Sequence, residues 1–295
     1  MKQNFSIIFF ICFTLLGCES KEDLAQKCAN LSDTGKISEA VLVCRKACDL
    51  DDGFSCRKLG YFYGTGTDVN LDYTQAKVLY EKACNLGESQ GCHNLGYLYT
   101  QGLGVQEDLT VAKTYYEKAC NLNNKDSCYN LGLYFKYSEQ YQQANKYFQM
   151  ACSMGSDEGC VYLGIAYENG LGIEKDYNKA RTYYDKACNF NNSVGCYNLG
   201  VLYYKGLGIR QDNQLANKYF TKACSLEYGM GCTVLGHLYE NGYGIEFNYQ
   251  LAKTYYEKAC NFDDGLGCRN LGYLYANGLG IKQNYHVAKK YYEKS

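Results

Sequence analysis

Cysteine is the residue type in this sequence with the greatest capacity for chemistry, since it can bind metal, act as a nucleophile or form disulfides. The 295 residues include 18 Cys and only three His. Most of the Cys fall in pairs with seven residues between the members, whereas zinc sites use ligands two to four residues apart. Reactive thiols need special surroundings at one position, not a repeating register. We therefore expect disulfides, with no metal site and no cofactor.

Seven of the pairs follow one another at intervals of 36 residues, apart from one interval of 32. They are Cys48/Cys56, Cys84/Cys92, Cys120/Cys128, Cys152/Cys160, Cys188/Cys196, Cys224/Cys232 and Cys260/Cys268. Antiparallel helices would also bring Cys92 near Cys120, but that scheme leaves Cys268 unpaired. We expect the sequential pairing, in which each bridge closes a short loop and stabilises the fold by about 2.5 kcal/mol.

Two further cysteines, Cys28 and Cys44, precede this series. Aligning the leading segment through Ala40 and Ala47 puts Cys28 at the position of a helical glycine and Cys44 at that of its aromatic partner. We hypothesise that a Cys28–Cys44 bridge locks an N-terminal cap.

The N-terminus, residues 1–18, is typical of a signal peptide. Lys2 precedes an apolar run from Phe5 to Leu16 that is too short to span a bilayer. The sequence Leu15-Leu16-Gly17-Cys18 resembles the lipobox of bacterial lipoproteins, which predicts a lipid on Cys18; ordinary cleavage and release is the alternative. We expect an exported protein, in the periplasm or outer membrane as a lipoprotein or else secreted, touching membrane only through a lipid anchor at Cys18.

The cysteines mark an internal repeat. Within the unit around Gly91–Leu122, apolar residues recur at spacings of three and four at Leu95–Tyr99 and again at Ala112–Ala119. This periodicity predicts two amphipathic helices per unit. The predicted fold is all-α, a right-handed α/α solenoid of disulfide-stapled helical hairpins. A capping hairpin at 19–53 precedes seven repeats within 54–295, at 54–89, 90–125, 126–157, 158–193, 194–229, 230–265 and 266–295.

Glycine within the first helix, as at Gly96, costs about 1 kcal/mol relative to Ala. We expect it to allow close approach of the paired helix, with Tyr116 filling the space. Gly102 and Gly104 are expected to form the turn, and Asp108 to cap the second helix.

The motif series within this unit resembles the Sel-like repeat, a relative of the tetratricopeptide repeat. It consists of Leu-Gly-x-x-Tyr, Gly-x-Gly-Val/Ile, Asp-x-x-x-Ala and Tyr-Tyr-x-Lys-Ala. With a Cys pair in each unit and a signal peptide, the chain resembles the Helicobacter cysteine-rich protein family. That resemblance implies an exported solenoid and, as an alternative function, β-lactam (penicillin) binding with weak β-lactamase hydrolysis.

Catalytic motifs are otherwise scarce, and no catalytic residue is predicted. One Ser-x-x-Lys occurs, from Ser55 to Lys58, without the Ser-Asp-Asn or Lys-Thr-Gly elements of serine β-lactamases. We interpret Ser55 as part of a helix start. The balance of 30 basic and 31 acidic side chains argues against nucleic acid as a partner.

The first helices carry candidate binding residues, because a solenoid presents such helices on a long concave surface. By resemblance to tetratricopeptide repeats, the repeated asparagines could bind the backbone of an extended peptide, or they could tie neighbouring repeats together. Tyr and His beside them offer apolar area and polar groups. The candidates are Asn94, Asn130, Asn198, Asn270, Tyr97 and His237. The leading prediction is binding of peptide or protein segments or peptidoglycan fragments, with β-lactams as the alternative ligand and a purely structural role as a third possibility.

Overall fold

The computed structural model describes residues 19–295, which form sixteen α-helices and contain no strand. The predicted signal peptide and the lipid site at Cys18 lie outside the described residues. The helices are α2 (Lys21–Asp33), α3 (Ile37–Asp49), α4 (Gly53–Thr65), α5 (Tyr73–Asn85), α6 (Ser89–Gln101), α7 (Leu109–Asn121), α8 (Lys125–Tyr137), α9 (Tyr141–Ser153), α10 (Asp157–Asn169), α11 (Tyr177–Asn189), α12 (Ser193–Lys205), α13 (Asn213–Ser225), α14 (Gly229–Asn241), α15 (Tyr249–Asn261), α16 (Gly265–Asn277) and α17 (Tyr285–Tyr292).

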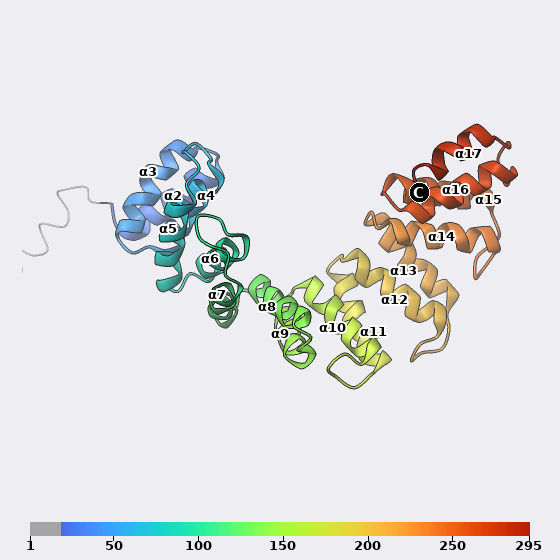
Figure 1. Ribbon diagram of the computed structural model, residues 1–295, viewed down its shortest axis with the longest axis horizontal. Helices are drawn as coiled ribbons and strands as arrows, with labels where there is room; N and C mark the ends of the chain where they lie inside the picture. The colour runs from blue at the N-terminus through green and yellow to red at the C-terminus, as the bar shows by residue number, and fades with distance from the viewer. Residues whose placement is uncertain (1–18) are drawn as a thin grey trace, which may run out of the picture. The chain divides into compact units, whose positions relative to one another are not determined.

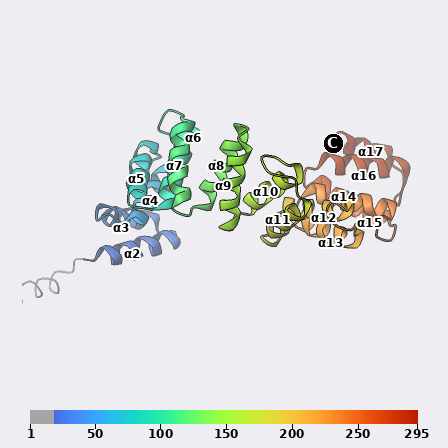
Figure 2. The same cartoon turned by 90° about the horizontal axis from the view of Figure 1, so that it is seen from below.

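Consecutive helices form hairpins, and the hairpins pack in series as a solenoid (Figure 1). The chain divides into two compact units, one ending at Cys128 and the other running from Tyr129 to Ser295. Within a unit, second helices pack on the first helix of their own hairpin and on that of the next, as α5 packs on α4 and α6 and α15 packs on α14 and α16. First helices of neighbouring repeats also contact one another, as α4 contacts α6 and α14 contacts α16. Figure 2 shows the same hairpins from below, including the adjacent α16 and α17.

Local sequence sets the helix boundaries. Gly102 ends α6 with a φ of 65°, a left-handed conformation that favours glycine. The Asp108 side chain accepts hydrogen bonds from the backbone N–H groups of Thr110 and Val111, at 2.9 and 3.0 Å, and so caps α7. Both expectations for this turn are confirmed.

The helical glycines mark where paired helices meet. A Cβ added at Gly96 would lie 2.8 Å from Cε1 of Tyr116, and one at Gly164 would lie 2.5 Å from Cε1 of Tyr184. Both distances are shorter than any carbon contact allows, so only glycine fits. The predicted packing of Gly96 against Tyr116 is confirmed.

Eight disulfides join the described cysteines. Seven bridges link the end of a second helix to the start of the next first helix: Cys48–Cys56, Cys84–Cys92, Cys120–Cys128, Cys152–Cys160, Cys188–Cys196, Cys224–Cys232 and Cys260–Cys268. The pairing is sequential, as the spacing predicts. All of these sulfurs lie in the buried core between hairpins.

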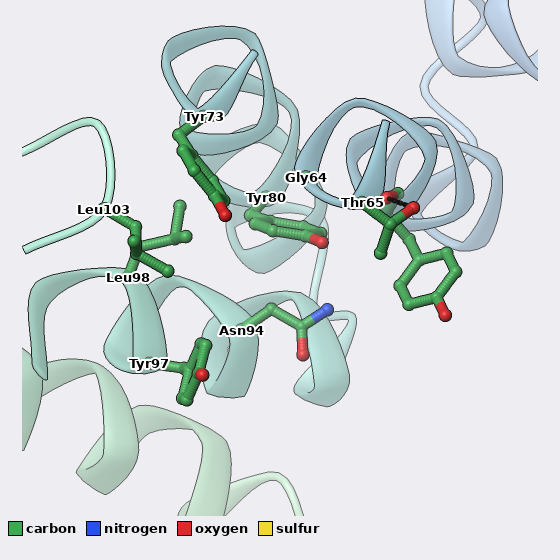
Figure 3. A pocket seen from close by; sticks show the side chains of 9 residues that line it. Gly64, Thr65, Tyr73, Tyr80, Asn94, Tyr97, Leu98 and Leu103 are labelled. Atoms are coloured by element: carbon green, nitrogen blue, oxygen red, sulfur yellow. Dashed lines mark hydrogen bonds between the residues drawn. The ribbon is translucent and has the colours of Figure 1, made fainter. Parts of the chain in front are cut away.

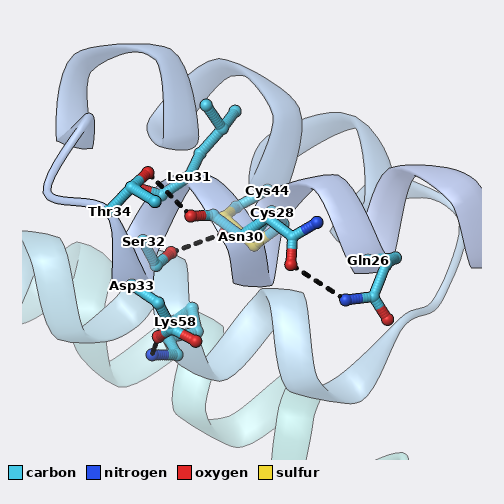
Figure 4. Close-up of polar contacts among 9 residues, drawn as sticks. All are labelled: Gln26, Cys28, Asn30, Leu31, Ser32, Asp33, Thr34, Cys44 and Lys58. Carbon is cyan, nitrogen blue, oxygen red and sulfur yellow. Dashed lines mark hydrogen bonds and ion pairs between the residues drawn. A yellow bond between two sulfur atoms is a disulfide. The ribbon is translucent and has the colours of Figure 1, made fainter.

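The eighth bridge, Cys28–Cys44, joins the two helices of the N-terminal hairpin and is fully buried. Figure 4 shows it beside Ser32, whose hydroxyl donates to the Cys28 carbonyl at 2.7 Å. The same hairpin is tied to α4 by an ion pair of 3.6 Å between Asp33 and Lys58. The bridge occupies the place that a contact between glycine and tyrosine or phenylalanine takes in the later hairpins.

Lysines near the ends of second helices provide a further link between repeats. Lys82 donates to the carbonyl of Cys48 at 2.6 Å, and Lys222 donates to that of Cys188 at 2.7 Å. Each carbonyl also accepts from a backbone N–H of the following turn, and the ammonium group adds a positive charge at the C-terminus of the preceding second helix, where it is favourable.

Candidate functional site

The first unit contains a cavity of about 350 Å³ between neighbouring first helices. Its lining side chains come from α4, α5, α6 and the loop after α6: Tyr61, Gly64, Thr65, Tyr73, Tyr80, Asn94, Tyr97, Leu98 and Leu103. Figure 3 shows Tyr73 and Tyr80 of α5 beside Asn94 and Leu98 of α6. None of these nine lining residues carries a formal charge, so the cavity presents aromatic and aliphatic surface with a few hydroxyl and amide groups.

Tyr80 and Asn94 provide the polar groups deepest in this cavity. Tyr80 is only 5% exposed, and burial raises the pKa of its hydroxyl to about 12, although a hydrogen bond with Asn94 acts in the opposite direction. The Oδ1 atom of Asn94 accepts from Gln90 at 3.0 Å. Through Tyr80, a residue of the preceding second helix, Asn94 links two repeats, and its side chain also lines the cavity. Its binding of a peptide backbone stays a prediction.

Gly64 is unusual among the residues at its place in the repeat. In the repeats that carry Thr100, Glu168 and Glu240, the equivalent side chain bonds the buried tyrosine: the Thr100 hydroxyl lies 3.2 Å from that of Tyr116, and the hydroxyls of Tyr184 and Tyr256 donate to Glu168 and Glu240, each at 2.6 Å. A glycine at position 64 leaves that place open above Tyr80. Sequence reasoning missed Gly64, although its departure from the other repeats is visible in the sequence.

In the second unit, two cavities over equivalent helices share His237 and Asn270. One, of about 330 Å³, is lined by Tyr197, Val201, Tyr204, Lys205, Phe220, Thr233, Val234, His237, Leu238 and Asn270. The other, of about 410 Å³, is lined by His237, Glu240, Arg269, Asn270, Tyr273 and Tyr292. Unlike the first unit's cavity, these carry charged groups at Lys205, Glu240 and Arg269.

Asn270 takes part in a polar network with the preceding repeat. The Tyr256 hydroxyl donates to Glu240 at 2.6 Å. Burial raises the pKa of that hydroxyl, the Glu240 carboxylate raises it further, and a hydrogen bond with Asn270 lowers it. Asn270 thus resembles Asn94 in joining two repeats beside a cavity.

Four of the six predicted groove residues line cavities. Asn94 and Tyr97 meet in the first unit, where Tyr97 is 49% exposed, and His237 and Asn270 meet in the second. The other two, Asn130 on α8 and Asn198 on α12, are partly buried and line none of the three cavities described above.

The Ser-x-x-Lys motif lies away from these cavities. Ser55 is fully buried in the first turn of α4, and its backbone N–H donates to the capping residue Asp52 at 2.7 Å. Lys58 forms an ion pair with Asp33 at the end of α2. A fully buried hydroxyl offers a substrate no access, which favours the helix-start interpretation.

A second buried hydroxyl, that of Ser127, lies 2.8 Å from Nδ1 of His93. Burial lowers the pKa of His93, while the nearby charge of Asp126 opposes that effect. This pair links two repeats. Because Ser127 is fully buried, it offers no exposed nucleophile.

Within residues 19–295, no cluster of His, Cys, Asp or Glu is placed to hold a metal ion, and no helix is long and apolar enough to cross a membrane.

These features define an α-helical repeat protein whose first helices carry solvent-accessible cavities. The chain belongs to the Sel1 repeat family, whose model matches residues 53–88, 89–124, 125–156, 157–189, 193–228, 229–261 and 265–295. A Sel1 repeat solenoid is a scaffold typical of protein–protein interaction. Among curated protein sequences, none matches the chain significantly.

Three solved structures illustrate the similarity. The protective antigen c5321 of uropathogenic Escherichia coli, which has an SLR fold, is 26% identical with a TM-score of 0.80, over 86% of this chain and 56% of that protein. This chain therefore matches little more than half of that antigen's length. A Sel1 repeat protein from Oxalobacter formigenes is 24% identical with a TM-score of 0.69, over 80% of this chain and 96% of that one. Helicobacter pylori cysteine rich protein B is 39% identical over 45% of this chain and 99% of its own, with a TM-score of 0.37.

Proposed function

We propose that this protein is an exported binding module that holds extended peptide segments on the face formed by its first helices. The observation that carries the proposal is the repeated placement of an Asn side chain beside an aromatic cavity, at Asn94 in one unit and Asn270 in the other. An amide can both donate to and accept from a peptide backbone. Aromatic cavities next to it supply the apolar contact area that anchors side chains.

Packing between the helices supports the choice of surface. First helices of neighbouring repeats contact one another, and the cavity of the first unit opens between α4 and α6 with Tyr80 of α5 at its base. In solenoids, the helices that approach each other most closely lie on the concave side, where extended ligands bind.

Export is supported by the disulfides. Eight buried bridges in one chain indicate an oxidising environment, extracellular or periplasmic, since the cytoplasm keeps thiols reduced. We propose that residues 1–18 direct the chain there and that Cys18 is the point of lipid attachment. Peptide stems of peptidoglycan belong to the ligand class that the surface would accept.

Peptide selection tests this function. The oxidised protein is panned against a library of unstructured peptides, and enriched peptides are titrated by calorimetry into the wild type and into Asn94→Ala and Asn270→Ala. We expect each enriched peptide to lose about tenfold in affinity with one of these variants, the effect of one lost hydrogen bond. Asn121→Ala, at the end of α7, is the control. Failure to enrich any peptide, or affinities that neither cavity variant changes, would contradict the proposal.

A further inference from the structure

We propose that the cavity of the first unit is a pocket for one uncharged aromatic side chain of a bound peptide, and that Gly64 is the residue that opens it. This inference rests on the proposed function and names the ligand group that the first unit takes. It assigns to Gly64 a specificity role that no neighbouring repeat shares.

The space above Tyr80 exists because position 64 has no side chain. A Cβ placed at Gly64 would lie 3.4 Å from the Tyr80 hydroxyl and 3.5 Å from Cβ of Ala76, which are ordinary contact distances. Gly64 therefore differs from Gly60 one turn earlier, where a Cβ would lie 2.8 Å from Cε1 of Tyr80 and cannot be accommodated. Packing requires glycine at position 60 and leaves position 64 free to carry a larger residue.

Glycine at position 64 also has a cost to stability. It lies in the last turn of α4, where glycine is a poorer helix former than alanine. A side chain there could bond the buried Tyr80, as Thr100 does with Tyr116. Local stability thus favours a larger residue, and a residue that opposes local stability without a packing reason is typical of a functional site.

The chemistry of the walls selects the ligand group. Four tyrosines and two leucines surround the cavity, and no lining residue is charged. A charged side chain would lose its water without gaining an opposite charge, which is strongly unfavourable. Aromatic rings pack well against tyrosine in offset or edge-to-face arrangements. The Asn94 amide, which also bonds Gln90 and Tyr80, lies beside the cavity, next to the backbone of the residue that would carry the ring.

A sugar ring fits these walls less well than an aromatic side chain. Each sugar hydroxyl that leaves water needs a hydrogen-bonding partner. One of the few candidates, the Thr65 hydroxyl, already donates to the Tyr61 carbonyl at 2.9 Å and lies 2.6 Å from the Thr67 hydroxyl. The walls therefore offer more apolar contact than hydrogen-bonding capacity.

Binding of N-acetyl-4-fluorophenylalaninamide, followed by ¹⁹F NMR on the oxidised full chain, tests the proposal. We expect the wild type to bind this probe and Gly64→Thr to weaken binding by about 10- to 100-fold, the effect of losing the contacts of one aromatic side chain. The melting temperature of Gly64→Thr should be equal to or above that of the wild type. Gly64→Ala, whose Cβ fits without displacement, should weaken binding less. Ala276→Thr, at the equivalent position in the last repeat, is the matched control and should bind as the wild type does.

Competition against the fluorinated probe identifies which chemical group the cavity binds. We expect N-acetylphenylalaninamide to displace the probe, and N-acetyllysinamide and methyl N-acetylglucosaminide to leave it bound. Absence of probe binding, equal binding by Gly64→Thr, or displacement by the lysine or sugar compound would overturn the aromatic pocket. Those results would leave the proposed function standing if selected peptides still depend on Asn94 or Asn270. If the probe does not bind and no selected peptide depends on Asn94 or Asn270, both the aromatic pocket and the proposed function are overturned.

Discussion

The cavity of the first unit and the two cavities of the second lie between equivalent helices, yet their walls differ in charge. In the first unit, tyrosines and leucines line the cavity beside Asn94, and none of the nine lining residues is charged. In the second, Asn270 is accompanied by Lys205, Glu240 and Arg269. The shared features are the asparagine and an aromatic wall, whereas the charged residues differ from one cavity to the next.

This difference shows that a repeat protein can keep the residues that fix its backbone and still vary the residues that line its cavities. Helical glycines, their aromatic partners and the disulfides recur in each repeat and fix the backbone. Position 64 and the equivalent positions of the other repeats lie on the first helices. The residue type there differs among the repeats and is Gly, Thr, Lys, Glu, Tyr or Ala. Ligand chemistry can therefore change from one repeat to the next while the fold is retained.

Removing one disulfide should have the largest effect. Cys84→Ala/Cys92→Ala frees the ends of α5 and α6, which wall the first cavity, and should lower the free energy of unfolding by about 2.5 kcal/mol. Probe binding at the first unit should weaken as well, because its walls are no longer held in register. Urea denaturation followed by circular dichroism measures the first effect and ¹⁹F NMR the second.

Cys188→Ala/Cys196→Ala, in the second unit, is the matched control. It should lower stability by a similar amount without changing probe binding. Equal weakening of binding by both double variants would show that the probe site is not confined to the first unit.

Two alanine substitutions in α4 should have opposite effects on stability. Gly60→Ala forces a Cβ into the Tyr80 ring and should cost about 1–3 kcal/mol. Gly64→Ala meets only ordinary contacts and should raise the free energy of unfolding by about 0.5–1 kcal/mol. Thermal denaturation of the two variants beside the wild type checks the prediction. Destabilisation by both would mean that Gly64 is required for packing.

Lowering the pH should lower the free energy of unfolding of the first unit, because His93 is buried there. Burial lowers the pKa of this side chain below its usual 6.5, so the folded state binds fewer protons than the unfolded state as the pH falls. The stabilisation is fully present above pH 6.5 and is lost as the pH falls toward the folded-state pKa, with a slope of up to about 1.4 kcal/mol per pH unit. Urea titrations between pH 7.5 and 5 measure it.

His93→Tyr should flatten this dependence, since tyrosine occupies the equivalent positions 129 and 197. A profile that His93→Tyr does not alter would assign the acid sensitivity to another group.

Salt should have the smallest effect. Because no charged side chain lines the first cavity, raising NaCl from 0.05 to 0.5 M should change probe affinity by less than about twofold. Ligands that contact Lys205 or Arg269 in the second unit should weaken in the same titration. A strong salt response at the first cavity would indicate that the probe contacts a charge outside its lining.

Much of the fold could be predicted from spacing alone. The period of the cysteine pairs fixes the disulfides and the repeats, because a bridge between residues eight positions apart joins two adjacent helix ends. Gly96 and Tyr116 could be paired because a helical glycine that costs stability needs a packing reason. The Cys28–Cys44 bridge follows from the same alignment.

The candidate site was less accessible to sequence reasoning. Asn94 and Asn270 line cavities while Asn130 and Asn198 line none of those described, although the four are equivalent in the repeat. Whether a cavity forms beside the asparagine depends on neighbours from three helices. For Asn94 the deciding neighbour is Gly64, a residue 30 positions away whose importance lies in the side chain it lacks.

The most direct test of the account is titration of one selected aromatic peptide into Asn94→Ala and Asn270→Ala, with the wild type beside them. We predict that Asn94→Ala lowers its affinity by about tenfold and that Asn270→Ala leaves it unchanged, because the uncharged cavity of the first unit holds the ring. Equal loss with the two variants, or a loss confined to Asn270→Ala, would contradict the assignment of distinct ligand chemistry to the two units.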